Sequence, residues 1–205
     1  MQTIQTQILK NELNFLPDEQ VLKDLNKWLL LFKEYNSHTN LISKNDVEQI
    51  FEKHIFDSLG ILKYKEFNPN KSLKILDFGT GGGFPSVILA ICFRNLNIIA
   101  NDSIGKKIKF IEILKEELKL DNLTPIKERV ENLPPQNVDY ILSRAVGKTA
   151  DVYKLTKKHL NNNGRIVLYK GKNVQDELLD FKHKTELVKY TLPTKEHHER
   201  YLVII

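Results

Sequence analysis

The stretch Lys74-Ile75-Leu76-Asp77-Phe78-Gly79-Thr80-Gly81-Gly82-Gly83-Phe84-Pro85 decides the fold of this chain of 205 residues. Its first half is a short apolar run with the length of a buried strand. Three glycines in its second half permit positive φ angles and let the backbone approach a ligand closely: Gly79, Gly81 and Gly83. Pro85 suits a first helical turn, and the apolar residues 86–93 continue that helix. The stretch therefore predicts a strand, a turn and a helix whose free N–H groups point at a ligand.

The spacing of the glycines separates two classes of nucleotide-binding turn. The dinucleotide fingerprint G-x-G-x-x-G needs glycine or alanine where this chain has Phe84. A carboxylate, Asp102, ends the next expected strand at 97–102, near the offset at which an acid accepts hydrogen bonds from a ribose. The turn has no lysine to hold a triphosphate, so the pattern predicts a nucleoside pocket, and S-adenosylmethionine is the ligand that fits best. The alternative is a glycine turn used only for tight packing.

Composition and hydropathy are those of a globular domain. The chain is 41% hydrophobic and 28% charged, and its length suits one well-cored domain. The N-terminus has no signal pattern, and the longest apolar run, 87–93, is too short to span a membrane. The single cysteine, Cys92, lies inside that run and is expected to be a small core residue. We therefore expect a cytoplasmic monomer with no membrane partner.

The positive charge of the chain is concentrated toward its C-terminus. Residues 140–205 contain 13 Lys and Arg against 7 Asp and Glu, whereas residues 1–139 contain 18 against 19. A basic C-terminal third is typical of a protein that meets a phosphate backbone. Solvated helix faces are the alternative explanation for the same charges.

Two amphipathic patterns precede the glycine turn. Apolar residues recur every three or four positions from Val21 to Tyr35 and again from Val47 to Leu62, with caps offered at 43–45. A connector at 68–70 then leads into the first strand. We expect residues 1–70 to form an N-terminal helical cap, packed on a ligand-binding domain of residues 71–205.

The rest of the chain alternates between strand and helix patterns. We expect strands at 97–102, 123–126, 138–143 and 165–169, helices at 104–118, 150–160 and 174–184, and final strands at 187–192 and 200–205. Asn161 to Gly164 is expected to end the second of these helices. The alternation predicts an α/β fold in which a mostly parallel sheet carries helices on both faces and ends in an antiparallel hairpin.

Several segments resemble one known family, and they occur in the family's order along nearly the whole chain: Asn40-Leu41-Ile42, His54-Ile55-Phe56-Asp57-Ser58-Leu59, the turn 77–85, Ser103-Ile104-Gly105-Lys106-Lys107, Arg129-Val130-Glu131, Ser143-Arg144-Ala145 and Lys170-Gly171. They are similar to the bacterial ribosomal RNA small subunit methyltransferase G family (RsmG, also called GidB). The resemblance implies a class I methyltransferase (Rossmann-like) fold. It also implies methylation of a guanine of 16S rRNA at N7, with 16S rRNA or the small ribosomal subunit as partner.

The resemblance also assigns cofactor residues: Gly79, Phe84, Val130, Glu131 and Arg144. The turn and the second strand add further candidates for contact with S-adenosylmethionine: Asp77, Gly81, Gly83, Asp102 and Ser103. We expect Asp102 to accept from the ribose, and Asp77 to order the turn or to meet the ammonium group of the cofactor. Gly82 and Ser86 differ from the residues common in the family, and neither difference removes a side-chain contact.

We expect no side chain to act as an acid or base, because guanine N7 carries a lone pair and no proton. Arg144 and Lys170 follow strands at the ligand edge of the sheet and are the positioning candidates. Arg144 could meet the cofactor carboxylate or an RNA phosphate, and Lys170 is expected to face RNA. His54 and Asp57 fit a helix-packing hydrogen-bond pair better than a catalytic dyad. His197 and His198 lack companion ligands, so we expect no metal site.

Three other functions remain as alternatives. Phe84 disfavours an NAD-linked oxidoreductase. The intact turn, together with the lack of an interleaved basic and aromatic surface, disfavours a non-catalytic RNA-binding module. A methyltransferase that acts on a small molecule or a protein would share this fold, because a fold does not determine its substrate.

Overall fold

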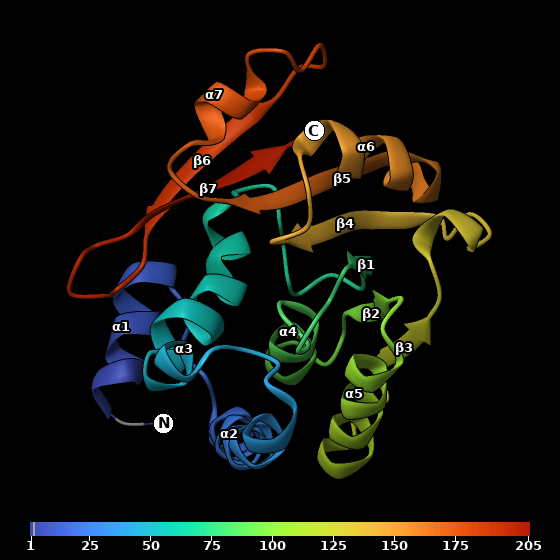
Figure 1. Cartoon of the computed structure of the whole chain (residues 1–205). Helices are drawn as coiled ribbons and strands as arrows, with labels where there is room; N and C mark the ends of the chain where they lie inside the picture. The colour runs from blue at the N-terminus through green and yellow to red at the C-terminus, as the bar shows by residue number, and fades with distance from the viewer. Residues whose placement is uncertain (2) are drawn as a thin grey trace.

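A seven-stranded sheet forms the centre of the computed structural model, which describes residues 1 and 3–205 without the side chain of Lys44 (Figure 1). The strand order is β3-β2-β1-β4-β5-β7-β6. The first five strands in this order are mutually parallel, and β7 pairs antiparallel with both β5 and β6. The strands are β1 (Lys74–Phe78), β2 (Asn97–Asp102), β3 (Leu123–Lys127), β4 (Val138–Arg144), β5 (Leu160–Lys170), β6 (Glu186–Thr191) and β7 (Glu199–Ile204).

The central strand β1 is apolar because both of its faces are covered. Ile75 packs into a core with the helices on one face, whereas its neighbour Leu76 belongs to the core on the other face. Successive side chains of a strand point to opposite faces, so one short run supplies both cores. The α/β architecture with helices on both faces is confirmed.

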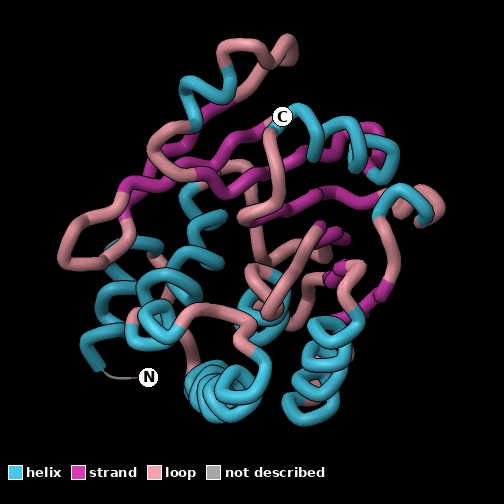
Figure 2. The backbone as a smooth tube through the Cα atoms, viewed as in Figure 1, coloured by secondary structure: helices cyan, strands magenta, loops and turns pink. Residues whose placement is uncertain are grey.

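The helices divide between the two faces (Figure 1, Figure 2). The first face is covered by α2 (Glu19–Thr39), α4 (Ser86–Cys92) and α5 (Gly105–Leu118). The second face carries α6 (Thr149–Thr156) with the 3-10 turns η3 (Val130–Asn132) and η4 (Lys157–His159), while α7 (Val174–Leu178) lies toward the terminal hairpin.

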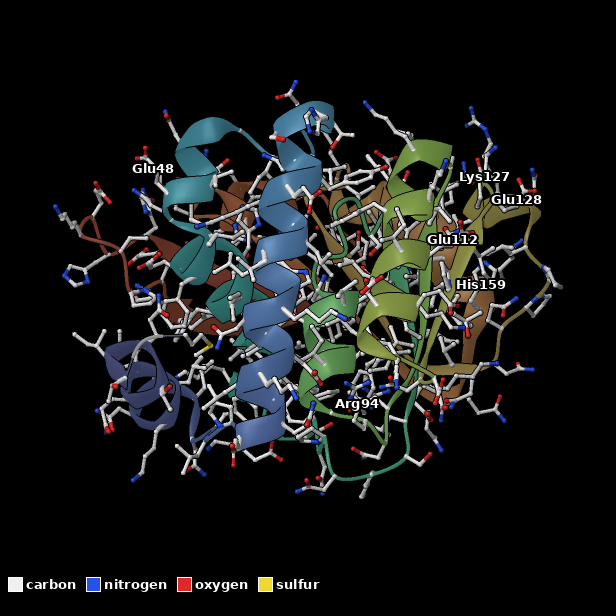
Figure 3. All side chains as sticks on the ribbon, turned by 90° about the horizontal axis from the view of Figure 1, so that it is seen from below. Glu48, Arg94, Glu112, Lys127, Glu128 and His159 are labelled. Atoms are coloured by element: carbon white, nitrogen blue, oxygen red, sulfur yellow. The ribbon has the colours of Figure 1, made fainter. Side chains whose placement is uncertain are left out.

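The N-terminal cap consists of helices that share a core with the sheet domain. Its elements are α1 (Thr3–Leu13), α2, α3 (Lys44–Glu48), the π-helical segment η1 (Phe51–Phe56) and the 3-10 segment η2 (Leu59–Lys63). Figure 3 shows α2 running alongside α5, and Tyr35 of α2 stacks on Phe110 of α5 with ring centroids 4.3 Å apart. Arg94, labelled in Figure 3, donates to Asp24 of α2 at 2.6 Å.

The second amphipathic pattern, 47–62, is not one helix. It changes from α to π to 3-10 geometry, and this change directs a run of large side chains inward, with Phe51, Ile55, Phe56 and Leu59 all buried. The expected cap is present, because Ser43 accepts from the Asp46 N–H at the start of α3. The connector at 68–70 leads into β1 as expected.

Two elements of the C-terminal half differ from expectation. Residues 161–164 do not end a helix but already belong to β5, where Asn161 donates to Asp139 at 2.7 Å beside a register irregularity in β4. The helix expected at 174–184 stops at Leu178; Leu179 is 82% exposed, and Phe181 contacts Tyr153 of α6 from outside the helix. Among the described residues, no helix is long and apolar enough to cross a membrane.

Candidate functional site

The glycine turn follows β1 and is fastened to the end of β2. The N–H groups of Gly79 and Thr80 both donate to the Asn101 carbonyl, at 2.9 and 3.0 Å. Gly79 has a φ of 72°, and a Cβ there would lie 2.3 Å from Cγ2 of Val146. Any side chain at Gly79 would therefore both strain the backbone and collide with the loop after β4.

Asp102 lies at the end of β2, directly beside the turn. Its Oδ2 accepts from the Gly81 N–H and from Lys107 Nζ, both at 3.1 Å, and its Oδ1 accepts from the Ile104 N–H at 2.9 Å. The residue is 7% exposed, so this carboxylate is held in one position at the cavity wall. A fixed carboxylate at a strand end is the group that accepts from ribose hydroxyls.

The opposite wall is the turn η3, which carries Val130 and Glu131. His159 donates from Nε2 to the Val130 carbonyl at 3.1 Å, and Lys158 Nζ donates to the Glu131 carbonyl at 2.6 Å. Burial lowers the pKa of His159, which keeps the ring neutral and leaves one N–H for this bond. The end of α6 and η4 thus holds the backbone of η3 in place.

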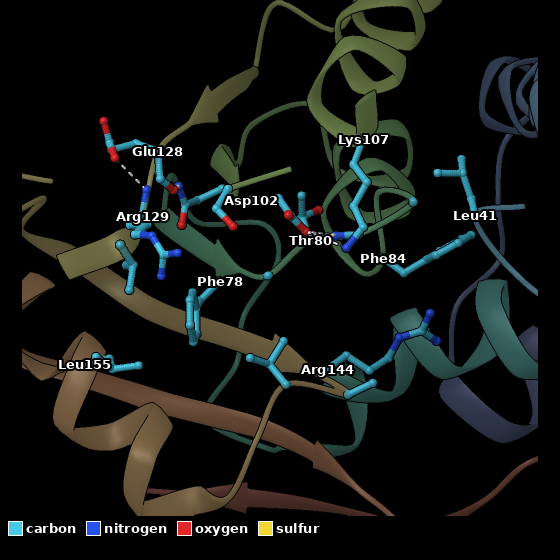
Figure 4. Close-up of a pocket in the computed structure, with 18 of the residues that line it drawn as sticks. Leu41, Phe78, Thr80, Phe84, Asp102, Lys107, Glu128, Arg129, Arg144 and Leu155 are labelled. Carbon is cyan, nitrogen blue, oxygen red and sulfur yellow. Dashed lines mark hydrogen bonds and ion pairs between the residues drawn. The ribbon is translucent and has the colours of Figure 1, made fainter. Parts of the chain in front are cut away.

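These elements enclose a first cavity of about 530 Å³ at the carboxyl ends of the strands (Figure 4). Eight of the ten expected cofactor residues line it: Gly79, Gly81, Phe84, Asp102, Ser103, Val130, Glu131 and Arg144. The cap contributes Leu41 and Ile42, whose loop is fixed by Asn36: the Ile42 N–H donates to Asn36 Oδ1 at 2.9 Å. Figure 4 shows Leu41 on the side of the cavity away from Glu128 and Arg129.

The other two candidates, Asp77 and Gly83, lie behind the turn and do not line the cavity. Asp77 is fully buried and accepts from the Ser86 N–H at 3.1 Å, at the start of α4. Burial raises the pKa of Asp77 to about 6. Of its two expected roles, this geometry favours ordering the turn. Gly83 has a φ of 93° and packs against Val87, so it serves the same turn.

Arg144, at the end of β4, is fixed by the cap. Its Nη1 donates to the Lys53 carbonyl at 2.9 Å and to Asp57 Oδ2 at 3.0 Å, and its Nη2 donates to His54 Nδ1 at 2.8 Å. The guanidinium also lies 4.9 Å from the centroid of the Phe84 ring. The prediction that His54 and Asp57 form a hydrogen-bonded pair is therefore wrong. Both residues accept a hydrogen bond from Arg144 instead.

Asp57 joins three segments of the chain. Arg200 of β7 donates to both of its oxygens at 3.0 Å, and Tyr190 of β6 donates to Oδ1 at 2.6 Å. Burial alone would raise the pKa of Asp57, but the charges of Arg200 and Arg144 outweigh it and the net shift is downward. The carboxylate is therefore ionised and ties the cap, β4 and the hairpin together.

Lys170 lines neither wall of the first cavity. Its Nζ donates to the Gly147 carbonyl at 2.9 Å and to Glu177 at 2.8 Å, which holds the loop after β4 against α7. Contact between Lys170 and RNA remains a prediction.

The sequence reasoning missed several residues of this site. Asn101 donates to the Ile126 and Glu128 carbonyls and so connects the turn to the segment before η3. Asn36, His159 and Arg200 were also missed as site residues. Asn101 could have been found, because it directly precedes the predicted ribose acid. Asn36 acts on a loop six positions away, whereas His159 and Arg200 depend on contacts between distant segments.

The fold is shared with solved methyltransferase structures. A precorrin-6y C5,15-methyltransferase from Geobacter metallireducens superposes with a TM-score of 0.55 at 18% identity, covering 80% of this chain and 89% of that one. A SAM dependent methyltransferase from Aquifex aeolicus gives a TM-score of 0.54 at 16% identity, covering 73% and 95%. At these identities the likeness establishes the class I methyltransferase fold.

Sequence comparison is more specific. The model of the family described as rRNA small subunit methyltransferase G matches residues 21–203. The chain is 39% identical to the ribosomal RNA small subunit methyltransferase G of Christiangramia forsetii, covering 86% of this chain and 84% of that protein. It is 33% identical to the protein of the same name from Francisella tularensis, covering 95% and 92%. The chain therefore belongs to the ribosomal RNA small subunit methyltransferase G family.

Proposed function

We propose that this enzyme transfers a methyl group from S-adenosylmethionine to N7 of a guanine in 16S rRNA. The observation that carries the proposal is the position of Asp102 beside the glycine turn, within a chain that matches the family over 21–203. The relatives act, by their names, on small-subunit ribosomal RNA.

The first cavity fits S-adenosylmethionine by size and by donor set. Its volume of about 530 Å³ is in the range of small-molecule sites. Asp102 would supply the acceptor for the ribose, the η3 backbone at Val130 and Glu131 would lie against the adenine, and the positive φ angles of Gly79 and Gly81 would allow close approach of the ligand. Of the lysines that the structure describes, only Lys107 lines this cavity, and it is paired with Asp102 at 3.1 Å, so none of them is free there to hold a triphosphate.

When bound, S-adenosylmethionine supplies a methyl group already activated on a sulfonium. The guanine N7 lone pair forms the new N–C bond while the electrons of the C–S bond stay on sulfur, and no proton is transferred. The protein therefore acts by holding the two reactants in line. Arg144, fixed by Asp57 and His54 and stacked on Phe84, forms a rigid wall at this point.

A methyl-transfer assay tests the proposal. Labelled S-adenosylmethionine is incubated with 16S rRNA, or with small subunits from cells that lack this enzyme, and the products are digested to nucleosides. We expect label in 7-methylguanosine, and a loss of transfer in Asp102→Asn but not in the control Asp121→Asn, an exposed acid at the opposite edge of the sheet.

The other outcomes are distinct. Cofactor binding without transfer to RNA would overturn the acceptor and redirect the search to a small molecule or protein. Failure to bind the cofactor would overturn the whole proposal. We also propose a cytoplasmic monomer, and light scattering at assay concentration checks the oligomeric state.

A further inference from the structure

A second cavity of about 700 Å³ lies next to the first. The two cavities share three lining residues, His54, Arg144 and Ala145. The second cavity is otherwise enclosed by the cap, by Gly171 and Lys172 after β5, and by the loop between β6 and β7. His54, Arg144 and Ala145 thus form a wall common to the two cavities.

The ionised groups around the second cavity leave positive charge unmatched. The single carboxylate of Asp57 lies between two guanidiniums, those of Arg144 and Arg200, each at 3.0 Å. One negative charge cannot neutralise two positive charges in a site of this burial.

Most of the other charged groups around the second cavity form ion pairs. Lys53 is paired with Asp46 at 2.9 Å, and Glu199 is paired with Lys189. Lys172 and Glu196 are exposed and also line the cavity; Lys172 has no ion-pair partner among the residues that the structure describes, and Glu196 lies 4.0 Å from His198 Nδ1. Arg144, Arg200 and Lys172 against Asp57 and Glu196 leave one positive charge, which a ligand that carries a phosphate would match.

The shared wall also contains an unused hydrogen-bond donor. Arginine can only donate, so the contact from Arg144 requires His54 Nδ1 to accept, and the ring proton lies on Nε2. His54 is 9% exposed, and its Nε2 has no acceptor among the described residues. A buried donor without an acceptor costs free energy until a ligand supplies one.

A purine can supply that acceptor. Guanine has O6 next to N7 on the same edge, whereas adenine has an amino group in the place of O6. Burial and the nearby charge of Arg144 lower the pKa of His54 to about 3, so the ring stays neutral and keeps its Nε2 proton at the pH of the cell. A neutral donor at the shared wall would accept guanine and reject adenine.

We propose that the second cavity binds the acceptor guanosine nucleotide of the RNA, with the N7 edge of the base at the wall of His54 and Arg144 and its phosphate against Arg200 and Lys172. This inference rests on the proposed function. It adds the place where the substrate binds and two groups that recognise it, the His54 N–H for the base and Lys172 for the backbone.

The phosphate contact is tested with Lys172→Ala, which removes an exposed side chain and does not threaten folding. Its matched control is Lys71→Ala, an exposed lysine just before β1, at the other edge of the sheet. For Lys172→Ala we expect kcat/KM for the RNA to fall roughly two- to fivefold. The slope of log(kcat/KM) against log[salt] should become shallower by about one. Binding of S-adenosylhomocysteine should not change. Equal behaviour of the two variants in both readouts would overturn the phosphate contact.

The base contact is tested with RNA that carries 2-aminopurine, which lacks O6 but keeps N7, at the guanine that the wild-type enzyme methylates. RNA with guanine at that position, which keeps O6, N7 and the 2-amino group, is the matched control. We expect the wild-type enzyme to lose roughly fivefold in kcat/KM with 2-aminopurine relative to guanine. His54→Phe, which keeps a ring against Phe84, should not distinguish the two substrates.

Equal discrimination by the wild-type enzyme and His54→Phe would overturn the base contact. Because both tests start from an RNA that the wild-type enzyme methylates, their failure differs from failure of the proposed function, in which the wild-type enzyme transfers nothing to guanine.

Discussion

The guanidinium of Arg144 and the carboxylate of Asp57 meet at 3.0 Å although 87 positions separate them in the chain. This contact joins the end of β4, where the two cavities meet, to the N-terminal cap. Asp57 also accepts hydrogen bonds from Arg200 and Tyr190. This one buried acid therefore positions both a wall of the site and the terminal hairpin.

Replacing Asp57 should therefore affect stability strongly. Asp57→Asn leaves two partly buried guanidiniums without a counter-charge, and we expect a loss of roughly 3–5 kcal/mol in the free energy of unfolding. Urea denaturation measures it. The control Asp46→Asn, which breaks a half-exposed pair with Lys53, should cost about 1 kcal/mol or less. An Asp57→Asn protein as stable as the wild type would show that the cluster does not hold these segments together.

The stability of the protein should depend on pH through Asp77. Its pKa of about 6 in the folded state lies above the ordinary 3.8, so the native state binds this proton more tightly than the unfolded chain does. The contribution of Asp77 to stability is therefore present below about pH 4 and is lost as the pH rises through 6.

Asp77→Asn removes this dependence, because the amide keeps an acceptor for the Ser86 N–H but cannot ionise. Relative to the wild type, the variant should gain roughly 2 kcal/mol between pH 4 and pH 7. Urea midpoints across that range provide the measurement. A constant difference between the two proteins at every pH would contradict the shifted pKa.

Lys107 should limit the affinity of the first cavity. It donates to Asp102 Oδ2 at 3.1 Å, so it occupies the carboxylate that the ribose hydroxyls need. We expect Lys107→Met to bind S-adenosylhomocysteine roughly two- to fivefold more tightly in calorimetry. Lys106→Met, at an exposed neighbour, should bind like the wild type. Weaker binding by Lys107→Met would mean that the ammonium group contacts the ligand itself.

His159 should affect the affinity for the cofactor through η3, the wall proposed to lie against the adenine, without contacting the ligand itself. His159→Phe keeps a ring in the core but leaves the Val130 carbonyl without its donor, so η3 loses one of its contacts and keeps the one from Lys158. We expect a three- to tenfold weaker affinity for S-adenosylhomocysteine, which is roughly 1 kcal/mol, with kcat at saturating cofactor nearly unchanged. His183→Phe, an exposed histidine, is the control. A variant that lowers kcat and leaves the affinity intact would refute this positioning role.

Much of the fold could be predicted from the sequence, because the sequence patterns that indicate it lie within short stretches of the chain. The run before Gly79 has the apolar character of a strand covered on both faces, and the glycine spacing, with Asp102 after the next strand, indicated the nucleoside pocket. Where tertiary packing rather than propensity decided a boundary, the prediction was wrong. Asn161 to Gly164 read as a helix end but joined β5, and the helix that begins at Val174 ended at Leu178, just before the exposed Leu179.

The sequence by itself thus determined the order of elements, the glycine turn and the carboxylate at the end of β2, since each depends on neighbouring residues or on one strand-to-strand step. Only the tertiary structure decided which charges meet. Asp57 is 143 positions from Arg200, and His159 is 29 from Val130. Such contacts depend on the register of the sheet and on the way the cap packs against it. That packing turned Lys170 toward Glu177, left Lys172 exposed, and placed His54 in the wall that two cavities share.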